Sequence, residues 1–166
     1  MPVTIRPMNT DEFEVFCQWS VQQHAKELAE ELHISEEAAI REAKEELAQM
    51  LPDGILTSDN YLMTIAEADS DESAGFIWTL HEEFEGHKQS FLCDFAIWEP
   101  KRRKRYASAA LGLAENLAAQ MGCQESVLFV SDDNEAAKAL YQKSGYRVLR
   151  QKDYGKFMIK TIAQKV

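Results

Sequence analysis

Five consecutive basic residues stand directly before a segment of small residues, and their types and spacing suit the binding of an anion. The run is Lys101–Arg105, and the segment after it, Tyr106–Ala110, has the composition of a helix start. The first backbone N–H groups of a helix lack acceptors, and the helix dipole adds about half a positive charge there. Basic side chains beside a helix N-terminus suit the binding of a diphosphate. Two other interpretations account for the basic run without the helix: a solvated basic loop or a contact to nucleic acid.

Asp94 is the second residue with chemical potential, because it interrupts the most apolar segment of the chain, Phe91–Trp98. Near-continuous apolarity predicts a strand buried on both faces at the centre of a sheet. Burial of a carboxylate raises its pKa toward the range in which it can exchange protons near neutral pH. A structural acid that is hydrogen-bonded to neighbouring elements is the other interpretation of Asp94.

The sequence also excludes several kinds of site. It contains neither GxxxxGK[ST] nor GxGxxG, so two common glycine-rich phosphate sites are absent. No metal site is expected, because no histidine has ligand spacing with another histidine or with cysteine; the histidines are His24, His33, His81 and His87. The three cysteines are far apart, which predicts no disulfide and a cytoplasmic location; they are Cys17, Cys93 and Cys123.

The segments that must position these residues are predicted to be both helices and strands, in mixed order along the chain. This order predicts a mixed α/β fold (α+β mixed sheet) in a single domain over residues 1–166. Strands are expected at 3–7, 61–66, 75–80, 91–98, 126–130, 146–150 and 156–162, and helices after Asn9, after Ser35, from 106 to 121 and from 134 to 144. The second helix should bury Ile40, Ala43, Leu47 and Met50, and a polar connection is expected at 82–88.

Charge is distributed unevenly along the chain. Its 18 basic and 28 acidic residues give a net charge of −10. Residues 1–99 carry 5 basic and 22 acidic side chains, and residues 100–166 carry 13 and 6. Because nucleic-acid binding needs clustered positive charge, an acidic chain is not expected to bind nucleic acid generally. No segment approaches 18 consecutive apolar residues and the N-terminus lacks a secretion-signal pattern, so neither a membrane span nor secretion is expected.

Two motifs in the C-terminal half resemble the GNAT superfamily of N-acetyltransferases. Arg102-Arg103-Lys104-Arg105-Tyr106-Ala107 stands where that family has the pyrophosphate loop [Q/R]-x-x-G-x-[G/A]. The second motif, Asn134, Ala137, Leu140-Tyr141 and Gly145-Tyr146, follows the family pattern closely. The family usually has glycine at the position of Arg105, and often also at the position of Arg103. Glycine lets the backbone approach a phosphate closely and adopt a positive φ.

The resemblance implies a GNAT-like fold, a central mixed sheet of about seven strands flanked by about four helices, with acetyl-CoA as cosubstrate and no metal. The pantetheine arm would pair with the backbone of Phe95, Ala96 and Ile97, where two strands splay apart. The diphosphate would lie on Arg102, Arg103, Lys104, Arg105, Tyr106, Ala107 and Ser108. Asn134, with Ala137 in the same motif, would contact the pantetheine amides, or Asn134 would only cap a helix.

The resemblance also implies that Tyr141 protonates the departing thiolate, although Tyr141 could instead be a core residue. An amine nucleophile must lose a proton, so a carboxylate or a water relay must accept it. Asp94 is the first candidate, with Glu99 and Glu82 as alternatives.

The sequence therefore predicts acetyl transfer to a primary amine, either a small amine or a protein lysine or N-terminus, in a ternary complex. The acidic N-terminal half favours a cationic acceptor, bound between the first two helices and the hairpin after the third strand. A non-catalytic module that binds CoA or a protein is the alternative. A homodimer is possible.

Overall fold

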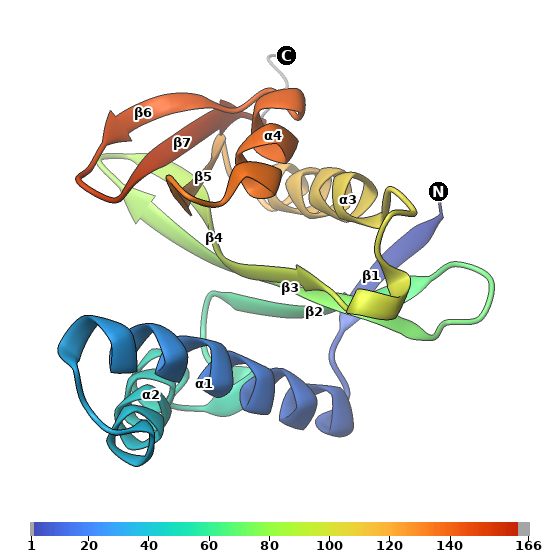
Figure 1. Ribbon diagram of the computed structural model, residues 1–166. Helices are drawn as coiled ribbons and strands as arrows, with labels where there is room; N and C mark the ends of the chain where they lie inside the picture. Colours follow the sequence, from blue (N-terminus) through green and yellow to red (C-terminus); the bar gives the residue numbers. More distant parts are fainter. Residues whose placement is uncertain (1, 163–166) are drawn as a thin grey trace.

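The computed structural model describes residues 2–162, which form one seven-stranded mixed sheet and four α-helices (Figure 1). The strands are β1 (Val3–Pro7), β2 (Asn60–Glu67), β3 (Ser73–Phe84), β4 (His87–Ile97), β5 (Glu125–Ser131), β6 (Arg147–Gln151) and β7 (Gly155–Thr161). The helices are α1 (Thr10–Leu32), α2 (Glu36–Met50), α3 (Tyr106–Gln120) and α4 (Glu135–Lys143), with 3-10 turns η1 (Gly54–Leu56) and η2 (Glu99–Lys101). The predicted mixed sheet is confirmed.

The strands lie in the order β1-β2-β3-β4-β5-β7-β6, and β4 with β5 is the parallel pair within an otherwise antiparallel sheet. Helix α3 lies on one face with α4 beside it, and the α1–α2 pair lies on the other face (Figure 1). Ala110 and Leu111 of α3 pack with Ile77 on the first face. Phe16 of α1 packs with Trp78 on the second. Each face of the sheet is thus covered by its own apolar cluster.

Three of the helices within residues 2–162 begin with a side-chain cap. Asn9 accepts a hydrogen bond from the amide of Glu12 and completes a capping box at α1. Ser35 accepts a hydrogen bond from the Ala38 amide at α2, and Asn134 accepts one from the Ala137 amide at α4. Helix α3 has no side-chain cap, and its N-cap residue Arg105 is in the left-handed conformation. The start of α3 therefore keeps its first amides free.

The connection predicted at 82–88 is wrong, because β3 and β4 continue through it. Glu83 pairs with Lys88, and the turn consists of Glu85 and Gly86, both with positive φ. Two such residues form the tight turn whose twist matches that of a hairpin. The hairpin extends beyond the packed faces of the sheet, so its polar residues carry no strand-like alternation. The prediction that α2 buries Met50 is also wrong, because Met50 is 52% exposed.

The expectation that both faces of β4 are buried is only partly correct. Leu92 and Ile97 are buried, but the residues between them are half-buried. Strand β5 pairs with β4 only from Gln89 to Leu92, so the second half of β4 has no strand on that side. In addition, Asp94 pairs with Trp78 while Leu92 pairs with Thr79, which leaves Cys93 as the extra residue of a β-bulge.

No helix within residues 2–162 is long and apolar enough to cross a membrane.

Candidate active site

The open half of β4 is the centre of the candidate site. Phe95 and Ala96 pair with β3 on one side, whereas β5 has already separated on the other. Strand residues direct their N–H and C=O groups alternately to the two neighbouring strands, so part of this backbone faces the gap without a strand partner. Part of that gap is already used, since the Arg102 Nε donates to the Ile97 carbonyl at 3.0 Å. The splayed geometry expected at Phe95–Ile97 is present.

A cavity of about 680 Å³ continues from this gap to the start of α3. It is lined by Ile97, Lys101, Arg102, Arg103, Arg105, Tyr106, Ala107, Ser108, Leu140 and Lys143. Five of these residues are lysines or arginines, and none is acidic. The uncapped amides at the start of α3 lie in the same lining as these bases. This donor set fits the diphosphate that the sequence predicts.

Arg103 and Arg105 adopt the left-handed backbone conformation that glycine adopts most readily. Their φ angles are +66° and +63°. Both side chains are exposed, so their Cβ atoms meet no packing obstacle. A non-glycine residue in this region costs about 1–3 kcal/mol. The loop therefore has left-handed geometry at both positions and carries the strain of two arginines.

Glu67 organises the basic run, although nothing in the sequence marks it as a site residue. Its carboxylate accepts hydrogen bonds from Lys101 Nζ and Tyr106 Oη, both at 2.6 Å. These two bonds lower the pKa of Glu67. Lys101 also lies 3.3 Å from Glu72. No sequence signal links Glu67 to residues more than thirty positions later, because only the sheet brings them together.

The five bases are consequently not equivalent. Lys101 is neutralised by acids, and the Arg102 guanidinium is hydrogen-bonded to the backbone. Arg103, Lys104 and Arg105 form no ion pair within residues 2–162, and Lys104 lies 5.9 Å from the Tyr106 ring. The Tyr106 hydroxyl points to Glu67, so its backbone amide is the group that remains for a ligand. Four of the five bases, Arg102 to Arg105, therefore keep an unpaired positive charge within residues 2–162, and Arg102 is also oriented by its hydrogen bond to the backbone.

Asp94 and Tyr141 lie near enough for the charge of Asp94 to act on the phenol of Tyr141. Burial raises the pKa of Asp94 to about 6, against the effect of a hydrogen bond from the Phe95 amide at 2.9 Å. Tyr141 is buried on α4, where burial and then the charge of Asp94 raise the pKa of its phenol to about 12. Near neutral pH, Asp94 is therefore largely ionised and Tyr141 is protonated.

A second cavity of about 460 Å³ opens beside Asp94 under the α1–α2 pair. It is lined by Trp19, Ser20, Gln23, His24, Glu27, Ala43, Glu46, Leu47, Met50, Trp78, Cys93, Asp94, Phe95 and Asn134. Three of these residues are acidic, and none is lysine or arginine. The acceptor was expected between the first two helices and the hairpin after the third strand, and this cavity is lined by residues of both helices. The β3–β4 turn does not line it, because the turn projects beyond the sheet.

Of the remaining predicted residues, Asn134 and Ala137 belong to the start of α4, whereas Glu82 and Glu99 lie away from both cavities. Asn134 caps α4 through a 3.2 Å hydrogen bond from the Ala137 amide, and it also lines the acidic cavity. Ala137 packs against the core, and its amide is used by this cap. The alternative bases Glu82 and Glu99 are exposed and line neither cavity. Within residues 2–162, no group of three or more His, Cys, Asp or Glu side chains is arranged to hold a metal ion.

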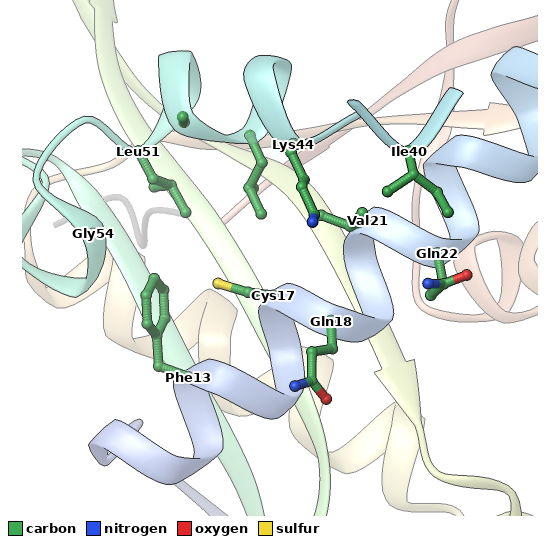
Figure 2. A pocket seen from close by; sticks show the side chains of 11 residues that line it. Phe13, Cys17, Gln18, Val21, Gln22, Ile40, Lys44, Leu51 and Gly54 are labelled. Carbon is green, nitrogen blue, oxygen red and sulfur yellow. The ribbon is translucent and has the colours of Figure 1, made fainter. Parts of the chain in front are cut away.

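A third, apolar groove of about 620 Å³ lies between α1 and α2 and is separate from Asp94. Figure 2 shows Phe13 and Cys17 on the α1 side and Leu51 and Lys44 on the opposite side. Leu47 lines both this groove and the acidic cavity. The groove contains no carboxylate, and its titratable side chains are Cys17 and Lys44.

The sequence is similar to those of known acetyltransferases. The model of the acetyltransferase (GNAT) family matches residues 17–146. YdgE of Bacillus subtilis, named as an uncharacterized N-acetyltransferase, is 32% identical over 146 residues, which cover 88% of this chain and 92% of that protein. YycN of the same organism, also named as an N-acetyltransferase, is 28% identical over 147 residues, covering 89% of this chain and 94% of YycN.

Solved structures share the fold. The crystal structure of YycN has a TM-score of 0.78 at 27% identity and covers 91% of this chain and 98% of its own. Spermidine N-acetyltransferase of Vibrio cholerae, solved in complex with CoA and spermine, has a TM-score of 0.70 at 15% identity, with coverage of 97% and 96%.

Proposed function

Since the chain belongs to the acetyltransferase (GNAT) family and is an acyltransferase, we propose that it transfers an acetyl group from acetyl-CoA to a positively charged primary amine. The observation that carries this proposal is the pair of cavities beside the open half of β4. One is lined by five basic and no acidic residues, and the other by three acidic and no lysine or arginine residues. An anionic donor and a cationic acceptor would each be attracted to its own side.

Acetyl-CoA fits the basic cavity by the chemistry of its lining. The free amides at the start of α3 and the unpaired Arg103, Lys104 and Arg105 suit its phosphates. The strand-like backbone at Phe95–Ile97 suits its pantetheine amides. The CoA complex of the Vibrio cholerae neighbour supports the same cosubstrate. Acetyl-CoA supplies the acetyl group in activated form, as a thioester.

Asp94 is proposed as the group that receives the proton of the amine, directly or through a water molecule. Its carboxylate attracts an ammonium group, and a pKa of about 6 leaves it largely ionised at neutral pH. Asp94 adjoins the β-bulge and lines the acidic cavity, which supports this role. The exposed Glu82 and Glu99 lack this position.

Tyr141 is proposed as the hydrogen-bond and proton donor to the sulfur of the departing thiolate. It remains protonated near neutral pH because its pKa is raised to about 12. Part of that increase comes from the charge of Asp94. When Asp94 accepts a proton, this part disappears and Tyr141 becomes a stronger acid. The two groups are therefore coupled in the direction that the reaction needs.

The alternative, a module that binds CoA without catalysis, makes a different experimental prediction. With acetyl-CoA and a panel of amines, the enzyme releases free thiol faster than background, whereas a binding module does not. Calorimetric titration with CoA in parallel tests the basic cavity separately. No heat of binding at millimolar CoA, together with no thiol release, would remove the proposal.

A further inference from the structure

The acidic cavity holds more negative charge than one amine requires. Asp94 lies on β4, Glu27 on α1 and Glu46 on α2, and all three line the same volume of about 460 Å³. The charge of Glu27 contributes to the raised pKa of Asp94, so these two carboxylates act on one another. A single ammonium group at Asp94 would leave the two glutamates without a cationic ligand.

The two glutamates are only partly compensated by the protein. His24 lies between them, in contact with Glu46 through Nε2 and 3.7 Å from Glu27 through Nδ1. Neither glutamate has another ion-pair partner within residues 2–162. Glu46 is the more enclosed of the two, with 40% of its side chain exposed against 73% for Glu27. Glu46 is therefore the better anchor for a cation, because water screens it less.

Apolar side chains line the same cavity as these carboxylates. Trp19 comes from α1, and Leu47 and Met50 come from α2. Such walls favour a methylene chain, and an indole ring also attracts a nearby ammonium group. Carboxylates on β4 and on α2, combined with apolar walls, are complementary to an alkane chain that carries an amine at each end.

Resting on the proposed function, we infer that the acceptor is a small aliphatic diamine or polyamine. One amine lies at Asp94 and reacts, and the second binds at the Glu46–Glu27 pair. Glu27 and Glu46 are therefore specificity-determining residues, which distinguish diamines from monoamines and from the single amine of a lysine side chain.

The first test measures free-thiol release from acetyl-CoA with matched acceptors. Putrescine is compared with butylamine and cadaverine with pentylamine, and a peptide with one free lysine is included. The kcat/KM for each diamine should exceed that of its monoamine at least about fivefold, the factor that corresponds to one partly exposed ion pair. The peptide should not exceed the monoamines.

The second test uses charge-neutral variants. Glu46→Gln should reduce the diamine-to-monoamine ratio about fivefold, toward one, and Glu27→Gln should reduce it less, because Glu27 is more exposed. Glu30→Gln is the matched control, since Glu30 is an exposed acid on α1 that does not line the cavity. It should keep the wild-type ratio. A thermal melt of each variant shows whether it is folded. The comparison of diamines with monoamines on the wild-type protein tests the inference even if a variant does not fold.

Each outcome decides the inference. Equal kcat/KM for diamines and monoamines, a ratio that Glu46→Gln does not change, or preference for the peptide lysine overturns it while leaving amine acetylation intact. If no amine is acetylated although CoA binds, the proposed function falls and the inference falls with it.

Discussion

Replacing Asp94 by Asn is expected to make the protein more stable and less active at the same time. Burial raises the pKa of Asp94 from 3.8 to about 6, so the folded protein holds the proton more tightly than the unfolded chain. The contribution of Asp94 to the free energy of unfolding is therefore largest below pH 3.8, and this contribution is lost as the pH rises through 6. At higher pH the ionised carboxylate costs about 3 kcal/mol relative to a neutral side chain, because each pKa unit corresponds to about 1.4 kcal/mol.

Urea unfolding of the wild type and of Asp94→Asn measures this cost. The stabilisation by Asn should be larger near pH 8 than near pH 5 by about 1.4 kcal/mol, since the wild-type carboxyl is largely protonated at the lower pH. The amide oxygen of Asn can still accept the hydrogen bond from Phe95. Thiol release by the wild type should rise with pH through about 6, and the variant should lose at least about 100-fold in rate.

Glu99→Gln is the control for both measurements. Glu99 is an exposed acid five positions from Asp94 and lines neither cavity. Its replacement should change neither the pH dependence of stability nor the rate. A stability difference for Asp94→Asn that does not vary with pH would refute the argument from burial. Retention of the wild-type rate would refute the proton-accepting role.

Three further predictions concern residues around the gap. Tyr141→Phe should lower kcat at least about tenfold while the calorimetric Kd for CoA stays the same, and an unchanged rate would exclude Tyr141 as the proton donor. Arg105→Gly removes the strain of a φ of +63° and should increase the free energy of unfolding by about 1 kcal/mol in denaturant. The same change should weaken CoA binding by calorimetry, because one unpaired positive charge is lost; tighter binding would contradict the role of that charge. Gly75→Ala should destabilise the protein by about 1–3 kcal/mol or more, because the added Cβ would lie 2.1 Å from the Ala96 carbonyl oxygen; a melting temperature equal to that of the wild type would contradict this packing.

The helix boundaries followed from the sequence because they depend on neighbours along the chain. Asn9 and Glu12 satisfy each other's backbone amides across three residues, and Ser35 and Asn134 cap their helices over the same short distance. The acid in the apolar segment was equally readable, because Asp94 is the one charged residue within Phe91–Trp98. The order of helices and strands follows from the same short-range pattern.

The length of the β3–β4 hairpin and the exposure of β4 did not follow from the sequence. Residues 82–88 are polar, and only pairing between the two strands makes them extended. The half-burial of β4 depends on where β5 separates from it, and β5 begins at Glu125, nearly thirty residues after the end of β4. Strand partners at such separations leave no periodic signal in either segment.

The sequence by itself determined which residues could do chemistry: a basic run before a helix, an acid in an apolar strand and a tyrosine in a short helix. Only the tertiary structure decided how they are used. Glu67 binds the side-chain ends of Lys101 and Tyr106 at the basic cavity, and Glu27 and Glu46 join Asp94 in the acidic one. The physical reason is that side-chain charges act through space, over distances that the sheet sets and that the order of residues along the chain does not record.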